Sequence, residues 1–211
     1  MALISPTITA LSDKDFMDDL QKIKMLAPRI HIDLMDGTFA PVKSVSLDRI
    51  SWPLGNVVDI HLMYQYPADY LKTIEKMSPR MVIVHNEANV HHMHFAAELH
   101  KQGILAGLAI LQDTPIENAY QIMHSFDQVL IFSGRLGYHG GTADLNLLDK
   151  VKKVRDHHPE AEIAWDGGIN AQNVARLVEG GVDILYVGGF IDNDPNPRDA
   201  YDKLNKLVVK I

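Results

Sequence analysis

The sequence contains no cysteine. This absence excludes disulfide bonds, thiolate zinc sites and cysteine nucleophiles, so any bound metal would have to rest on His, Asp or Glu. No apolar run approaches the roughly 20 residues that span a bilayer, and the opening segment MALISPTITA lacks the basic start of a signal peptide. We therefore expect a cytoplasmic protein with no membrane partner.

Positive charge is also scarce. The chain has 20 Lys and Arg residues against 27 Asp and Glu residues, which gives a net charge of −7. A protein that follows nucleic-acid phosphates normally carries a basic stripe, so no nucleic-acid partner is expected. The 211 residues are 46% hydrophobic and 22% charged, ordinary values for a domain with a buried core. The 11 histidines are more than such a domain needs, and they are the first indication of chemistry.

Short apolar, β-branched runs alternate with segments of helical period along the whole chain. The runs predict eight strands, at residues 3–9, 29–35, 57–63, 80–85, 104–110, 128–133, 161–166 and 183–188. Helices are predicted at residues 13–26, 91–103, 114–125, 170–181 and 196–211. Ser12 is a good N-cap for the first helix, and Gly103 is a natural end for the second.

This alternation predicts a parallel sheet with right-handed crossovers. Eight repeats favour closure into a (β/α)8 TIM barrel, a single domain over residues 1–211, while a doubly wound sheet of six or seven strands is the alternative. Residues 37–50 are too long for a turn and too irregular for a full helix. Because loops at the carboxyl ends of barrel strands build active sites, we expect this segment to form a lid or wall.

Polar side chains stand near the carboxyl ends of three predicted strands. His31 and Asp33 are two residues apart and so share a strand face, His61 lies on the next strand, and Asp166 precedes a glycine pair. A lone histidine at a strand end is more often a core or turn residue, and Asp before Gly-Gly is a common turn device. Together, two imidazoles and two carboxylates could hold one divalent ion, such as Zn, Mn, Fe or Co. A barrel mouth would bring the three strands together, whereas a flat sheet would not.

Most other histidines lie on predicted helices rather than strands. For His85, at the end of the fourth predicted strand, the sequence does not decide between a structural and a functional role. Five others are interpreted as parts of solvated helix faces: His91, His92, His94, His157 and His158.

Glycine-rich turns follow the last three predicted strands, at residues 133–145, 166–168 and 187–197. Glycine lets backbone N–H groups approach an anion, and phosphate sites of TIM barrels usually lie near the last two strands. These turns therefore predict a phosphate-bearing ligand. No P-loop or dinucleotide motif is present, so nucleotide chemistry has no support.

Five segments in order, ISPTI, HIDLMDGTF, DIHLM, VHNEA and DGGIN, make the chain resemble the ribulose-phosphate 3-epimerase family over almost its whole length. The resemblance implies that one divalent metal ion is held by His31, Asp33, His61 and Asp166. It also implies that Asp33 accepts the substrate proton and Asp166 donates one in one direction, with the roles exchanged in reverse. Removing a proton from one face of a carbon and returning one to the other requires such a carboxylate on each face.

The same resemblance implies the residues that hold the substrate. Ser5 and His61 would lie against it, and Met35 and Met63 would form an apolar wall around the enediolate. Six backbone positions would hold the phosphate: Gly140, Gly141, Gly167, Gly168, Gly188 and Gly189. The activity implied is the interconversion of D-ribulose 5-phosphate and D-xylulose 5-phosphate in the pentose phosphate pathway, by a homo-oligomer.

Several residues depart from the family pattern around the substrate. Phe132 stands where a third methionine is usual, Arg135 and Leu136 replace Asn-Pro, and His139 is an extra residue in the glycine turn. Val42 replaces an asparagine. These departures motivate an alternative substrate, another ketose phosphate such as D-allulose 6-phosphate. A further alternative is a sugar-phosphate-binding barrel without catalysis.

Overall fold

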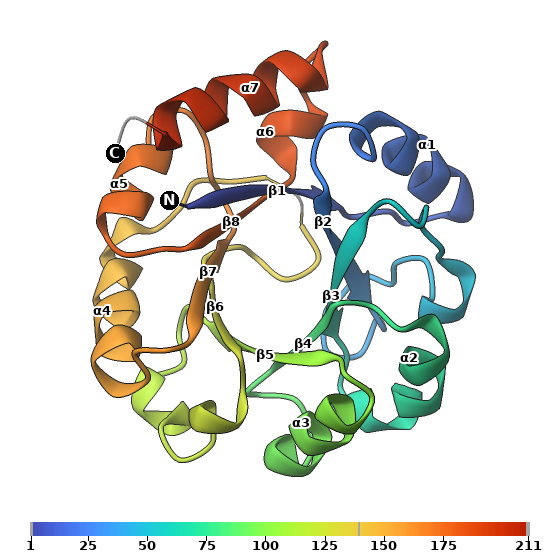
Figure 1. Cartoon of the computed structure of the whole chain (residues 1–211), viewed down its shortest axis with the longest axis vertical. Helices are drawn as coiled ribbons and strands as arrows, with labels where there is room; N and C mark the ends of the chain where they lie inside the picture. Colours follow the sequence, from blue (N-terminus) through green and yellow to red (C-terminus); the bar gives the residue numbers. More distant parts are fainter. Residues whose placement is uncertain (1, 139, 210–211) are drawn as a thin grey trace.

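A computed structural model describes residues 2–138 and 140–209. Its eight parallel strands pair in chain order, and β1 closes the ring by pairing with β8, so the predicted TIM barrel is confirmed (Figure 1). Every strand bound lies within one residue of the prediction. The strands are β1 Leu3–Ile8, β2 Arg29–Met35, β3 Val57–Met63, β4 Met81–His85, β5 Leu105–Leu111, β6 Gln128–Phe132, β7 Glu162–Asp166 and β8 Ile184–Val187.

Helices surround this ring, and within the described residues none is long and apolar enough to cross a membrane. The α-helices are α1 Asp13–Ile23, α2 Leu71–Met77, α3 His92–Lys101, α4 Leu148–His157, α5 Val174–Glu179, α6 Gly189–Asp192 and α7 Pro197–Val208. Short 3₁₀ turns are η1 Leu47–Arg49, η2 Pro67–Tyr70, η3 Ile116–Ala119, η4 Met123–Ser125 and η5 Leu145–Leu147.

Two helix predictions need correction. The helix expected at residues 114–125 is wrong, because the chain there forms the 3₁₀ turns η3 and η4. Its buried residues Ile116, Ala119 and Met123 keep a spacing of three or four, which both helix types satisfy, so periodicity alone does not separate them. The helix expected from residue 170 begins only at α5, because Asn170 and Asn173 first bind backbone N–H groups in side-chain turns.

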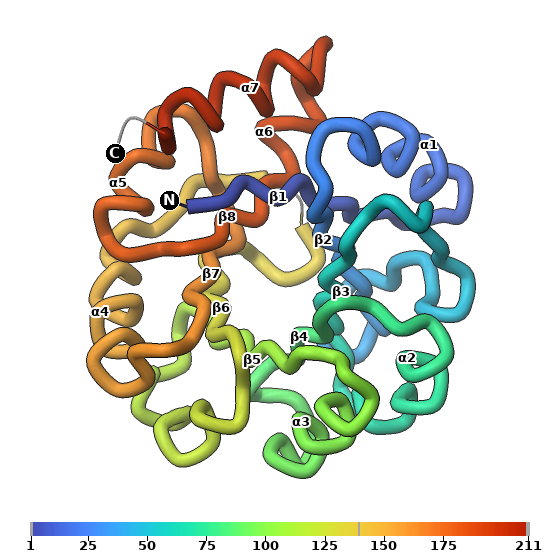
Figure 2. Tube along the Cα trace, viewed as in Figure 1, coloured from blue at the N-terminus to red at the C-terminus, as the bar shows by residue number. Residues whose placement is uncertain are grey.

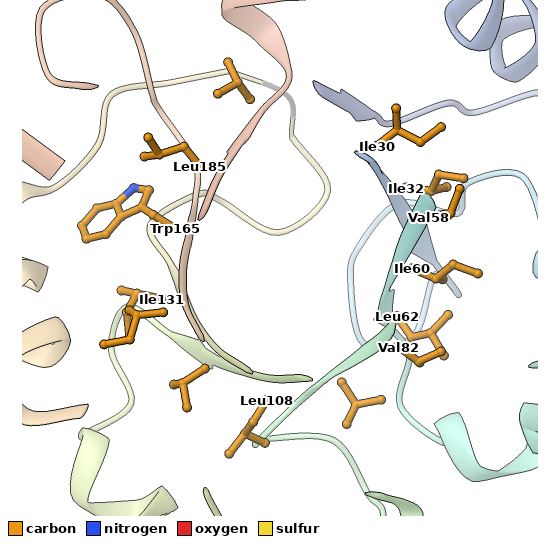
Figure 3. Close-up of a cluster of buried hydrophobic side chains, with 14 of the residues drawn as sticks. Ile30, Ile32, Val58, Ile60, Leu62, Val82, Leu108, Ile131, Trp165 and Leu185 are labelled. Atoms are coloured by element: carbon orange, nitrogen blue, oxygen red, sulfur yellow. The ribbon is translucent and has the colours of Figure 1, made fainter. Parts of the chain in front are cut away.

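Alternating residues of each strand face opposite sides of the barrel wall. Apolar side chains such as Ile30, Ile60 and Leu185 point outward and pack beneath the helices (Figure 3). The residues between them point into the barrel, and these include His31 and His61. The main core therefore lies between barrel and helices, and the interior holds polar groups beside a smaller apolar cluster.

A network of charged and polar side chains fills the barrel near the amino ends of the strands. Arg29 donates to Asp59 at 2.5 Å and forms two hydrogen bonds of 2.8 Å with Glu162. Asp59 also accepts hydrogen bonds from Arg80 at 2.8 Å and from the Tyr186 hydroxyl at 2.9 Å. The buried carboxylates depend on these cationic partners, because an unpaired buried ion is costly.

The substitution Arg29→Met is expected to lower the free energy of unfolding by about 3–5 kcal/mol, since it leaves Asp59 short of its buried partner. Urea unfolding followed by circular dichroism measures the loss. Arg49→Met is the matched control, because Arg49 pairs with Asp13 on the exposed surface, and it should change stability by less than about 0.5 kcal/mol. Equal losses in the two variants would contradict a stabilising role for the interior network.

Candidate active site

The structure brings the four predicted metal ligands together. Their ligand atoms all lie within 4.8 Å of one another, and all four residues are buried. Asp33 and His61 sit side by side in the pairing of β2 with β3, and Asp166 ends β7. The Nε2 atom of His31 and the Nδ1 atom of His61 lie 3.1 Å and 3.0 Å from the same oxygen of Asp33. His61 Nδ1 is 3.8 Å from Asp166 Oδ2.

The pKa values of the two carboxyl groups shift in opposite directions. Burial and the nearby charge of Asp33 raise the pKa of Asp166 well above its usual value. Burial would also raise the pKa of Asp33, but His31 and His61 outweigh it and hold that pKa well below its usual range. Burial lowers the pKa of His61 to about 4, so its imidazole is neutral at pH 7 and able to ligate a metal.

The donor set therefore fits a divalent cation. Charge on both of these closely spaced, buried carboxyl groups would be repulsive, and a positive ion between them would offset that repulsion. The Oδ2 atom of Asp166 is buried and has no hydrogen-bond partner among the described residues. Two imidazoles with two carboxylates suit Zn, Mn, Fe or Co. The cluster His31–Asp33–His61–Asp166 is the residue set that would hold such an ion.

A cavity of about 260 Å³ lies directly over this cluster. Asp33 and Asp166 reach its floor, while His31 and His61 are fully buried and do not line it. The predicted wall and phosphate residues all line the cavity: Met35, Met63, Gly140, Gly141, Gly167, Gly168, Gly188 and Gly189. The two carboxylates and the glycine turns thus face a single space.

Ser5, the serine for which the resemblance implies a substrate contact, does not reach the cavity. It is fully buried, its hydroxyl donates to the Arg29 carbonyl at 3.2 Å, and it is not part of the cavity lining. Thr7 and Thr9, further along the same strand face, line the cavity instead. Thr9 donates to Asp33 Oδ2 at 2.8 Å, and the buried Thr7 hydroxyl has no partner among the described residues. The substrate contact implied for Ser5 stays a prediction, and Thr7 and Thr9 are the residues of this strand face that reach the cavity.

The glycine pair after β7 allows a close approach between two loops. A Cβ atom on Gly168 would lie 2.1 Å from the backbone nitrogen of Ala143, and one on Gly167 would lie 2.2 Å from that of Gly134. Both glycines also have positive φ angles, of 108° and 70° for Gly167 and Gly168. Only glycine at positions 167 and 168 therefore allows the end of β7 to lie this close to the backbone of the loop after β6.

The loop after β6 extends across the barrel opening toward β2 (Figure 2). Its Leu136 packs with Phe39 and Val42 against the two methionines, Met35 and Met63. Residues 37–50, expected as a lid or wall, contain a 3₁₀ turn and no α-helix, and they support the methionine wall from outside the cavity. His139, the extra residue of the glycine turn, lies outside the described residues.

The other histidines considered in the sequence differ in their surroundings. His91, His94 and His157 are exposed, as expected for solvated helix faces. For His92 and His158 that expectation is wrong, because both are partly buried and lie 2.9 Å and 3.0 Å from backbone carbonyls. The histidine left open, His85, is fully buried, with its Nε2 atom 2.9 Å from Nε2 of His61. In the sequence, the one indication of this contact is the position of His85 at the end of a predicted strand.

Comparison with known proteins agrees with this geometry. A family model described as "Ribulose-phosphate 3 epimerase family" matches residues 3–191. The chain belongs to the ribulose-phosphate 3-epimerase family. Curated relatives named ribulose-phosphate 3-epimerase include one from Helicobacter pylori (strain J99), 28% identical over 94% of this chain and 95% of the relative. Another, from Mycobacterium leprae, is 28% identical over 97% of this chain and 94% of the relative.

Membership of the family confirms the prediction of an enzyme, a carbohydrate epimerase. Among solved structures, 3-hexulose-6-phosphate synthase from Salmonella typhimurium superposes with a TM-score of 0.73. It is 14% identical and is matched over 100% of this chain and 99% of its own, a likeness that concerns the fold alone.

Proposed function

We propose that this enzyme interconverts D-ribulose 5-phosphate and D-xylulose 5-phosphate by moving a proton between the two faces of the carbon beside the ketone. The observation that carries the proposal is the pair Asp33 and Asp166, which face one cavity with opposite pKa shifts. One group is set to accept a proton while the other is set to donate one. The family and the names of its relatives support the same reaction.

In one direction the ionised Asp33 removes the proton, and Asp166 supplies a proton to the opposite face. The hydrogen bond that Thr9 donates to Asp33 Oδ2 orients the carboxylate for this step. After one turnover Asp33 is protonated and Asp166 is ionised, which is the state that the reverse reaction needs. A divalent cation held by the four ligands would supply positive charge for the oxyanion that develops when the proton leaves.

The rest of the cavity suits a sugar phosphate. Met35 and Met63 present polarizable side chains without acidic protons, so they shield the reacting carbon from water without donating to it. The glycine turns leave backbone N–H groups free for a phosphate. Arg135 is the cation among the described lining residues, and its guanidinium carbon lies 4.2 Å from the centre of the Tyr138 ring. It would add a charge near the phosphate.

A coupled assay with D-ribulose 5-phosphate and D-allulose 6-phosphate tests the substrate. We expect kcat/KM to be at least about tenfold higher for the pentulose phosphate, a difference of about 1.4 kcal/mol in transition-state binding. A clear preference for the hexulose phosphate would contradict the proposal and support the alternative epimerase. Failure of the protein to exchange solvent deuterium into either sugar would instead support a binding barrel without catalysis.

A further inference from the structure

A line of three side chains runs from the candidate metal cluster into the barrel wall. His61 faces the cluster with Nδ1, and its Nε2 lies 2.9 Å from Nε2 of His85. On the far side of His85, its Nδ1 lies 3.5 Å from Oε2 of Glu87. Both histidines are fully buried, and the Glu87 side chain is 21% exposed. The line therefore joins a carboxylate outside the cluster to a ligand inside it.

The surroundings leave these atoms few other partners. Within the described residues, neither His85 Nδ1 nor Glu87 Oε2 makes a hydrogen bond. The Thr114 side chain also lies close to the Glu87 carboxyl group and, with His85, favours its ionised form. The second oxygen of Glu87 accepts from the Leu111 backbone N–H at 3.1 Å, which holds the carboxylate in place. Phe39 and Phe132 lie against the His85 ring, with centroids 4.8 Å and 5.6 Å away. These apolar rings keep water from competing for the contact.

Only one arrangement of ring protons satisfies this line when a cation is bound. A cation that takes the lone pair of His61 Nδ1 leaves the ring proton on Nε2. His61 then donates to His85 Nε2, so the proton of His85 must be on Nδ1. That N–H faces Glu87, whose ionised carboxylate can only accept. The reversed order would set a nitrogen lone pair of His85 against the carboxylate.

We propose that Glu87 and His85 are positioning residues that fix the tautomer of His61, so that Nδ1 presents its lone pair to the divalent cation. The inference rests on the proposed metal centre and names two residues that would support it without ligating the ion. Partners of this kind orient metal-ligating histidines and raise their basicity. Neither residue lines the cavity, so neither is expected to touch the substrate.

The test is a Co²⁺ titration of metal-depleted protein, followed by the visible absorption of the bound ion. His85→Ala should weaken Co²⁺ binding about 10–100-fold and alter the absorption bands, because His61 loses its support. His85→Gln should recover part of the affinity, since its amide oxygen can accept the same hydrogen bond. Glu87→Gln keeps the shape but permits the reversed proton order, and we expect about tenfold weaker binding.

The control is His100→Gln, because His100 also pairs with a carboxylate, 2.8 Å from Asp127, but lies on the surface. It should leave Co²⁺ affinity unchanged, and the unfolding midpoints of all metal-free variants show whether the fold is intact. If the His85→Ala and Glu87→Gln proteins are folded and bind Co²⁺ as tightly as wild type, the inference is overturned while the proposed metal centre stands. A wild type that binds no Co²⁺ would overturn both the inference and the proposed metal centre.

Discussion

Replacing either Asp33 or Asp166 by asparagine is expected to lower kcat for the epimerisation of D-ribulose 5-phosphate by at least about 10²–10⁴-fold, the range that a positioned acid or base contributes. Asparagine keeps the shape of aspartate but cannot carry the proton in either direction. Both residues reach the floor of one cavity, so both losses should appear in kcat rather than mainly in KM. Asp113→Asn, on an exposed aspartate after β5, is the matched control and should retain wild-type activity.

Exchange of solvent deuterium separates the two roles. With one acid–base group missing, the other can still remove and return the proton of the epimer that it faces. Each variant should therefore exchange deuterium into one epimer while failing to convert it into the other. Equal exchange into both epimers by a single variant would contradict the assignment of one carboxylate to each face.

The elements of the barrel could be predicted from the sequence because each strand carries its own signal. Apolar residues outside and polar residues inside alternate along β2 and β3, and this period of two is a local property of the chain. The same alternation placed His31, Asp33 and His61 on the interior face. Helices gave a weaker signal, since η3 and η4 keep the spacing of a helix without its hydrogen bonds.

Depth along the barrel axis could not be predicted from the sequence, and it determines that Ser5 does not reach the cavity. Sequence shows that Ser5 and Thr7 share a strand face, but the stagger between β1 and β2 decides which of them reaches the site. The structure pairs Thr7 with His31, so Ser5 lies one level deeper, beside the Arg29 carbonyl. Contacts between strands also depend on this register. His85 lies two residues beyond Ile83, the pairing partner of His61, and reaches the histidine diagonally.

Removing the divalent cation is expected to abolish activity, with a loss on the order of 10³-fold, because Lewis-acid stabilisation contributes several kcal/mol and each 1.36 kcal/mol is tenfold. Dialysis against a chelator, followed by metal analysis and the coupled assay, measures the effect. Zn, Mn, Fe or Co should restore turnover. Mg²⁺ should restore little, because it prefers oxygen ligands and two of the four donors here are imidazoles.

Binding of the metal should raise the stability of the folded protein as well as its activity. Without a cation, burial and the charge of Asp33 favour the protonated form of Asp166 by raising its pKa. A cation that binds only the folded protein adds about 4 kcal/mol of stability at a thousandfold excess over its Kd. The unfolding midpoint should therefore rise when Co²⁺ or Zn²⁺ is added, and Asp166→Asn should reduce this rise. Full activity in protein shown to be free of metal would contradict the metal centre while leaving the two-aspartate proton transfer to be judged by the asparagine variants.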